Sequence, residues 1–181
     1  GHLVLSTLHT NDAVSSITRL VDMGIPPYLV ASTVIGAVAQ RLLRRLCDEC
    51  KEAYKPGVEE REIFSDDVET LYRARGCDVC NASGYKGRIA ISEVLNVDSK
   101  VEEMIVKEAD EQEINRYAVD NGLMVSLNED AKSKVIQGYT SYQEMFSTLP
   151  QLHLFSFPVP HVRTRSIPVC PFVVRDGAIR A

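Results

Sequence analysis

Four of the five cysteines in this chain of 181 residues lie in two matched Cys-x2-Cys pairs. The first pair is Cys47 and Cys50, and the second pair, Cys77 and Cys80, lies within the segment GCDVCNASGYKGR. Each pair can bind a metal ion through two thiolates on a tight turn, and two pairs complete the tetrahedral shell that zinc prefers. Because a closed shell of four thiolates leaves no position for water, the sequence predicts a structural zinc ion, not a catalytic one.

Disulfides, free core thiols or a redox-active dithiol are the competing interpretations of these pairs. No secretory signal is recognisable in the sequence, which favours a compartment where thiols stay reduced and therefore a metal site. The spacer between the pairs is long, and we expect it to contain a helix over residues 66–73, capped around Ser65. Its length is then no obstacle to one shared metal site.

Composition and charge favour a globular protein and argue against a nucleic-acid-binding or membrane-spanning one. With 45% hydrophobic and 25% charged residues, the chain is expected to fold around a globular core. Residues 1–150 carry 16 Lys and Arg against 24 Asp and Glu, and this acidic body predicts no nucleic-acid partner. No apolar run approaches the length of about 18 residues that a membrane-spanning helix needs.

The two ends of the chain differ from its body. The chain begins with Gly1, directly on the apolar segment HLVLSTLH, which predicts a cut made inside a larger protein. Residues 150–181 have no helical or strand period and are predicted to be an irregular tail, non-native or disordered. This segment contains four spaced prolines: Pro158, Pro160, Pro168 and Pro171.

The N-terminal part of the chain predicts a strand followed by helices. Residues 2–9 are apolar at alternate positions on nearly both faces, as in a buried strand of an α/β sheet. Thr10 and Asn11 are predicted N-caps of a first helix, with Asp12 favouring its start and Gly24 ending it. A second helix is predicted to begin at Pro26 and to deliver Cys47 to the metal site. Its apolar positions repeat every four residues, at Val30, Val34, Val38, Leu42 and Leu46, and its polar face ends in Arg41, Arg44 and Arg45.

After the second cysteine pair, the sequence predicts a strand over residues 88–97 and then short helices. These helices are predicted to begin near Asp98, Asp110, Ser126 and Ser141, the third of them covering residues 131–137. The predicted domains are residues 1–46, an α/β core fragment; 47–88, the tetracysteine module; 89–149, a strand with a helical subdomain; and 150–181, the tail.

Three segments together carry a resemblance to a known family: GHLVLSTLHTNDAVSSITRLVDMG, VAQRLLRRLCDEC and GCDVCNASGYKGR. In this order, and followed by short helices to about residue 149, they resemble the C-terminal part of the type II secretion and type IV pilus assembly ATPases, the general secretion pathway protein E family. The resemblance implies part of a RecA-like P-loop ATPase fold. It also implies a hexameric cytoplasmic motor that uses ATP and Mg²⁺, peripheral to an inner-membrane platform, and powers secretion or pilus assembly.

The same resemblance implies roles for a few residues. His2 and His9 match the two histidines of the family's His box, which lie near the nucleotide γ-phosphate, and Arg41 is a weaker candidate for nucleotide contact. Glu93 matches an acidic residue that follows GYKGR in the family, although Ala90 and Ser92 replace the Gly and Tyr usual there. The competing interpretation is structural, with His9 hydrogen-bonded at a strand end and the arginines on a solvated helix face.

The phosphate-binding loop of such an ATPase requires G-x4-G-K-[ST], and none of the ten glycines is followed by Lys. We therefore expect this chain alone to be inactive in ATP hydrolysis, although its parent would be an ATPase. The alternative function is a zinc-ribbon binding module with no role in ATP hydrolysis. Whether the system secretes proteins or assembles pili does not follow from these residues.

Overall fold

The structure is a computed structural model, and it describes residues 2–149 and 173–174. Helices and strands are mixed along the chain, and the described residues divide into two compact units. Unit 1 contains residues 2–40, 92–127 and 173–174, and unit 2 contains residues 41–91 and 128–149.

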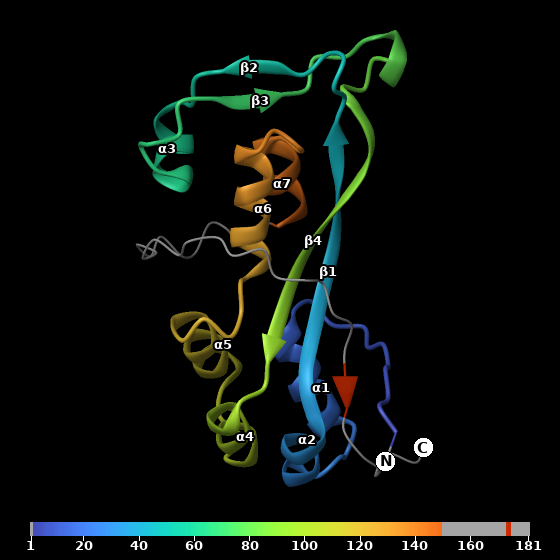
Figure 1. Ribbon diagram of the computed structural model, residues 1–181, viewed down its shortest axis with the longest axis vertical. Coiled ribbons are helices and arrows are strands. Elements are labelled where there is room, and N and C mark those ends of the chain that lie inside the picture. Colours follow the sequence, from blue (N-terminus) through green and yellow to red (C-terminus); the bar gives the residue numbers. More distant parts are fainter. Residues whose placement is uncertain (1, 150–172, 175–181) are drawn as a thin grey trace. The chain divides into compact units, whose positions relative to one another are not determined.

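Two long strands, β1 (Val34–Leu46) and β4 (Tyr85–Asn96), contribute residues to both units. They are neighbours in a sheet of order β4-β1-β5, and their arrows point in opposite directions in Figure 1. Strand β5 (Val173–Val174) pairs antiparallel with β1, with Val174 opposite Val34. Apart from these two residues, the predicted tail lies outside the described residues.

Unit 1 is built from four helices packed by apolar faces: α1 (Ala13–Asp22), α2 (Pro27–Thr33), α4 (Ser99–Val106) and α5 (Glu111–Asp120). Helix α2 packs on α4, and α1 packs on α5. The carboxylates of Asp98 and Asp110 cap α4 and α5, which confirms those two predicted helix starts. The cap of α1 is Asp12, which accepts from the Ser15 amide at 2.7 Å, so the predicted caps Thr10 and Asn11 were wrong.

Unit 2 contains a hairpin of β2 (Glu52–Tyr54) and β3 (Leu71–Arg73), with α3 (Val58–Phe64) between these strands. A 3-10 turn, η1 (Asp78–Cys80), precedes β4. Helices α6 (Leu127–Ile136) and α7 (Tyr142–Thr148) complete the described part of the unit. Ser141 caps α7 as predicted. Helix α6 begins directly after Ser126, the predicted cap, and four residues before the span 131–137 predicted for it. The helices predicted as one C-terminal subdomain therefore fall in both units.

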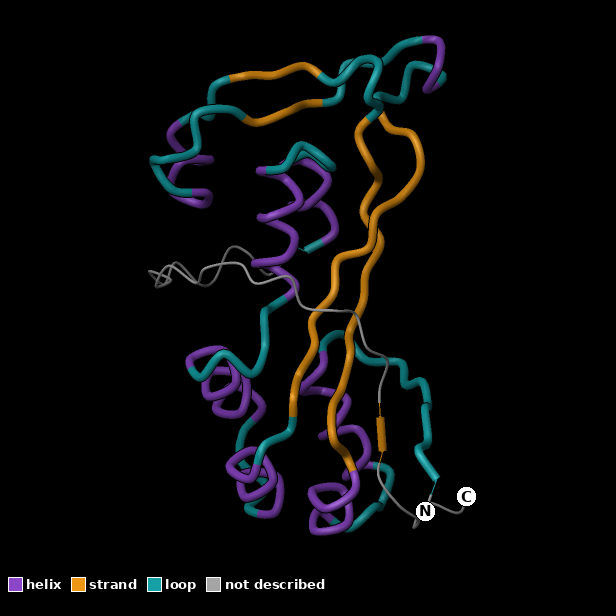
Figure 2. The backbone as a smooth tube through the Cα atoms, in the orientation of Figure 1, coloured by secondary structure: helices purple, strands orange, loops and turns teal. Residues whose placement is uncertain are grey.

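The predicted helix from Pro26 to Leu46 is wrong beyond Thr33. Helix α2 ends at Thr33 and β1 begins at Val34. Figure 2 shows the long strand that follows the short helix. A spacing of four residues fits one face of a helix, but it is also a multiple of the strand period of two. The β-branched Val34 and Ile35 favour a strand once the short helix ends.

Two further predicted elements are also wrong. No helix covers residues 66–73. Helix α3 lies earlier, ends at Phe64, and is followed by Ser65 with a φ of 84°, which a helix cannot adopt. Residues 2–9 do not form a strand beyond one isolated bridge at Val4, and the side chains of Leu3 and Leu5 are more than half exposed. A strand forms only by pairing along its length, and an alternating pattern cannot supply the neighbouring strand. The predicted strand over residues 88–97 is confirmed by β4.

None of the helices within residues 2–149 combines the length and the apolar character needed to cross a lipid bilayer.

Candidate metal centre

The four paired cysteines converge in unit 2, with all four Sγ atoms within 4.8 Å of one another. The Sγ–Sγ distances are 3.9 Å for Cys47 and Cys77, 3.8 Å for Cys50 and Cys80, and 3.7 Å for Cys77 and Cys80. Zinc at about 2.3 Å from four tetrahedral sulfurs places those sulfurs about 3.8 Å apart. The cysteines are free thiols, and their spacing fits a closed tetrahedral metal shell.

Both pairs begin with the same kind of hydrogen-bonded turn. In each, the amide of the second cysteine donates to the carbonyl of the first, at 3.3 Å for Cys50 to Cys47 and 3.2 Å for Cys80 to Cys77. A second amide closes each turn on the same carbonyl, from Lys51 in the first pair and from Ala82 in the second. The repeated spacing therefore gives each pair the same first hydrogen bond, although the two turns close differently, and the four thiols lie together.

Gly84 joins the two turns. Its carbonyl accepts from the Cys47 amide at 3.0 Å, and its own amide donates to Cys80 Sγ at 3.2 Å. Gly84 has a φ of 75°, and an added Cβ would lie 2.5 Å from the Cβ of Ala74. Only glycine fits this position, for both backbone and packing reasons.

Burial and hydrogen bonding shift the pKa values of the Cys50 and Cys80 thiols in opposite directions. Burial raises the pKa of the Cys50 thiol to about 11. Burial also acts to raise the pKa of Cys80, but the amide groups of Cys77 and Gly84, with neighbouring thiols, lower it to about 6. Amide donors that stabilise a thiolate also stabilise a metal-bound sulfur, since both carry negative charge. The surroundings of Cys80 thus favour the thiolate form that binds metals.

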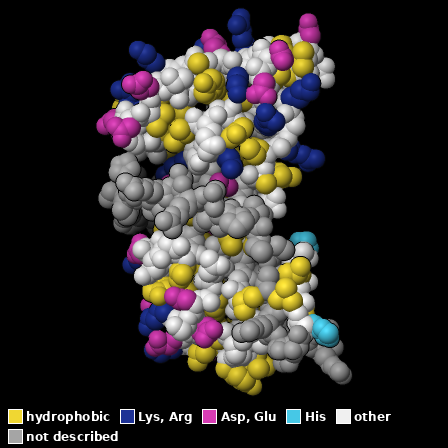
Figure 3. All heavy atoms as spheres, in the orientation of Figure 1, with side chains coloured by type: hydrophobic (Ala, Val, Ile, Leu, Met, Phe, Trp, Pro, Cys, Tyr) yellow, Lys and Arg dark blue, Asp and Glu magenta, His cyan; other side chains and the backbone are white. Residues whose placement is uncertain are grey.

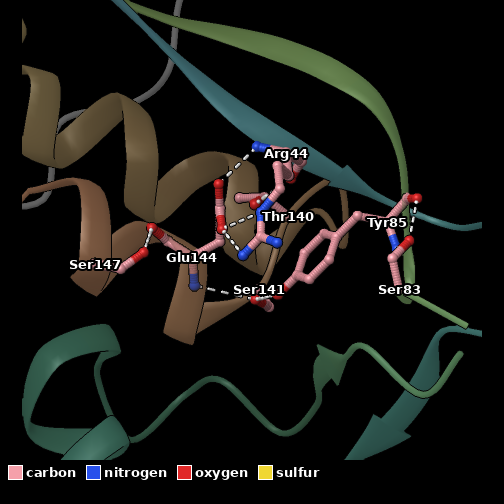
Figure 4. Close-up of polar contacts among 7 residues, drawn as sticks. All are labelled: Arg44, Ser83, Tyr85, Thr140, Ser141, Glu144 and Ser147. Atoms are coloured by element: carbon pink, nitrogen blue, oxygen red, sulfur yellow. Dashed lines mark hydrogen bonds and ion pairs between the residues drawn. The ribbon is translucent and has the colours of Figure 1, made fainter.

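Figure 4 shows a polar cluster on α7 and the ends of β1 and β4, whose member Arg44 lies three residues before Cys47 in the sequence. The Glu144 side chain is 7% exposed and forms an ion pair with Arg44 at 2.6 Å. The sequence placed Arg44 on a solvated helix face, and this pairing was missed. In the sequence, Glu144 is already explained by the helix-start pattern that it forms with Ser141. Only the burial of Glu144, which depends on the tertiary structure, indicates that it pairs with Arg44.

The residues predicted to sense nucleotide lie elsewhere. His2 and His9 belong to unit 1, in the segment before α1, and both are exposed, as the histidine side chains in Figure 3 also show. Thr10 is tied to the start of α1, with its Oγ1 2.8 Å from Ser16 Oγ. Arg41 lies on β1 in unit 2, and its Nη1 donates to the carbonyl of Thr148, at the end of α7, at 3.3 Å.

Glu93 occupies a second unusual position, in unit 1. Its side chain is buried, Oε1 accepts from the Ala13 amide at 2.8 Å, and Oε2 accepts from the Leu127 amide at 3.2 Å. Ala13 and Leu127 are the first residues of α1 and α6, so the carboxylate meets the positive ends of two helices. Burial raises the pKa of Glu93, and these two amides partly oppose that rise.

Comparison with known proteins identifies relatives over most of the chain. The model of a family described as "Type II/IV secretion system protein" matches residues 1–147. The chain is 47% identical over 148 residues to the type II secretion system ATPase E of Vibrio cholerae and 46% identical over 148 residues to the type II secretion system protein E of Pseudomonas aeruginosa. It is 42% identical over 152 residues to the type IV pilus assembly ATPase PilB of Thermus thermophilus.

These alignments cover 80%, 80% and 81% of this chain. They cover 29%, 29% and 17% of the three relatives, so the chain spans less than a third of the length of each.

Proposed function

The chain belongs to the type II/IV secretion system protein family, and we propose that it works as part of an ATPase motor that powers protein secretion or pilus assembly. One observation carries this proposal: the family match is continuous over residues 1–147 and includes the His9 segment and both cysteine pairs. Two of the relatives are named as ATPases, one of secretion and one of pilus assembly. We extend the proposal to a RecA-like core, a hexameric ring and a cytoplasmic position at an inner-membrane platform.

Within this motor, the tetracysteine site would hold one structural zinc ion. The support is the set of Sγ–Sγ distances of 3.7–3.9 Å, the donors to Cys80 Sγ, and the requirement for glycine at Gly84. Cys47, Cys50, Cys77 and Cys80 would be its four ligands. When bound, the metal would cross-link two turns that are 30 residues apart in the chain, which stabilises a small module with little core of its own.

His9 is our first candidate for γ-phosphate sensing, and His2 is the second. Both imidazoles are exposed, so they are accessible to a nucleotide bound by another part of the motor. Arg41 is better explained as a structural residue, because its guanidinium already bonds the last turn of α7.

ATP hydrolysis tests the motor proposal. We expect the purified chain to show no magnesium-dependent ATPase activity, since no glycine in it is followed by Lys. The coding sequence upstream of Gly1 should contain an in-frame G-x4-G-K-[ST], and the longer product should hydrolyse ATP until that Lys is replaced by Ala. Stoichiometric activity from the chain alone, or the lack of such a motif upstream, would overturn the proposal.

Metal analysis tests the zinc site separately. The fifth cysteine, Cys170, is first replaced by serine so that only the paired thiols react. In this Cys170→Ser background, we expect about one zinc ion per chain and four thiols that resist alkylation until a chelator is added. Rapid alkylation without chelator would favour the redox interpretation. Salt-sensitive binding of the zinc-loaded chain to DNA or RNA would favour the alternative zinc-ribbon module.

A further inference from the structure

The loop between α6 and α7, residues 137–141, accepts hydrogen bonds from both sides of the first cysteine pair, from a main-chain amide before it and from a lysine side chain after it. The amide of Leu46, immediately before Cys47, donates to the Tyr139 carbonyl at 2.9 Å. The Nζ of Lys51, immediately after Cys50, donates to the Gly138 carbonyl at 3.3 Å. The first cysteine turn is therefore held at both ends by a segment that supplies no metal ligand.

Helix α7 strengthens this attachment through one buried carboxylate. Glu144 Oε1 accepts from the Arg44 main-chain amide at 2.9 Å, and Oε2 accepts from Arg44 Nε at 2.7 Å and pairs with Nη2 at 2.6 Å. Thr140 Oγ1 donates to the Arg44 carbonyl at 2.8 Å. Arg44 is thus fixed through its amide, its carbonyl and its guanidinium, three residues before Cys47 (Figure 4).

The second cysteine pair is attached to the same helix through Tyr85. This residue follows Gly84, whose amide donates to Cys80 Sγ. The Tyr85 hydroxyl lies 2.6 Å from Ser141 Oγ, and the Arg44 guanidinium stacks on its ring, 4.2 Å from the ring centroid. Figure 4 shows these side chains joining α7 to the ends of both long strands.

We propose that α7 is the outer support of the metal site, and that Glu144 is a positioning residue that couples metal affinity to the docking of α7. The proposal rests on the proposed zinc site. Ligands that are already held in place lose less conformational freedom when the metal binds, so groups that fix them raise the affinity. The coupling is reciprocal, and zinc should therefore hold α7 in place.

Zinc competition with a chromophoric chelator tests the first half of this coupling, using the full chain in the Cys170→Ser background. Glu144→Gln keeps the size of the side chain and an oxygen acceptor but removes the negative charge that pairs with Arg44. We expect zinc affinity to fall about 10-fold, at the low end for residues that support metal ligands. The control is Glu103→Gln, the same substitution at an exposed carboxylate in unit 1 that pairs with Lys100 and Lys107. The zinc affinity of this variant should stay within about 2-fold of that of the unmodified protein.

Two further measurements keep the test decisive if Glu144→Gln does not fold. Tyr85→Phe removes only the hydroxyl that meets Ser141, and we expect a loss of about 3-fold. In the unmodified chain, amide hydrogen exchange in α7 should accelerate when zinc is removed, whereas exchange in α5 of unit 1 should not.

The outcomes separate this proposal from the zinc site itself. The coupling is refuted if the unmodified chain binds zinc, the Glu144 and Tyr85 variants bind it equally well, and zinc removal leaves the hydrogen exchange of α7 unchanged. Helix α7 would then contact the site without affecting its zinc affinity. A lower stability with unchanged zinc affinity would refute it in the same way. If the unmodified chain binds no zinc, both the zinc site and the coupling fall.

Discussion

Glu93 joins the first residues of two helices through one buried carboxylate, with no cation in hydrogen-bond contact among the partners described for it. Most buried carboxylates are paired with a cation, because burial strongly disfavours the isolated charge. Here the amides of Ala13 and Leu127 and the positive ends of α1 and α6 provide the compensation. The compensation is incomplete, since burial still raises the pKa of Glu93 above its ordinary value of 4.5.

This raised pKa predicts the sign of a pH effect. A carboxyl with a higher pKa in the folded state binds its proton more tightly when folded. Its contribution to stability is therefore fully present below pH 4.5 and is lost as the pH rises through the folded pKa. We expect the unfolding free energy of the unmodified chain, relative to Glu93→Gln, to decrease between pH 4.5 and 7.5 in urea unfolding followed by circular dichroism.

Glu103→Gln is the control for this experiment. Hydrogen bonds from Lys107 and Lys100 lower the pKa of Glu103 to about 2, so its contribution is lost only as the pH falls below 4.5. Between pH 4.5 and 7.5 the difference between the unmodified chain and Glu103→Gln should stay flat. A flat difference for Glu93→Gln as well would contradict a raised pKa at Glu93.

Among the helices and strands, β1 differs most clearly from its prediction, because the sequence pattern predicts a helix and the structure has a strand. The helical pattern placed Leu42 in the buried stripe, but Leu42 is 50% exposed in the strand, whereas its neighbour Leu43 is fully buried. We expect Leu43→Ala to lower the unfolding free energy by about 2–5 kcal/mol. Leu42→Ala should change it by less than about 1 kcal/mol.

Denaturant unfolding of the two single variants checks this register. The substitutions are chemically identical and lie one residue apart, so any difference between them reports burial alone. If Leu42→Ala lowered the unfolding free energy more than Leu43→Ala, the result would favour the predicted helix over this segment.

Local signals explain which elements the sequence predicts well. Asp98, Asp110 and Ser141 are helix caps that act over two or three residues, and their helices begin where those signals predict. The predictions that are wrong concern residues whose structure depends on distant partners. A strand over residues 2–9 requires a paired neighbour, and the position of Arg44 depends on Glu144, 100 residues away. The cysteine site is predictable because ligand spacing encodes a long-range contact directly.

Both units of the molecule bury apolar side chains, and unit 2 also contains a short hairpin beside the cysteine cluster. In unit 1, helices α4 and α5 bury apolar side chains, among them Val101, Ile105, Ile114 and Ala118. In unit 2, the β2–β3 hairpin has only three residues in each strand, and such a two-stranded hairpin is marginal by itself. It begins directly after the first cysteine turn and ends just before the second. The four clustered cysteines therefore lie at the two ends of the loop that contains the hairpin.

Removing zinc should consequently loosen this hairpin first. Without the metal, the ends of the loop between Cys50 and Cys77 are held by hydrogen bonds alone, and the loop regains conformational freedom. We expect hydrogen exchange of the β2 and β3 amides to accelerate at least 10-fold after chelation, with α4 and α5 unchanged, because the exchange of those helices depends on their apolar core. Mass spectrometry of peptides from both units gives the two rates in one sample. Equal acceleration in both units would mean that one cooperative transition includes the metal site and the helical core, and no acceleration in either would mean that the hairpin is stable without metal.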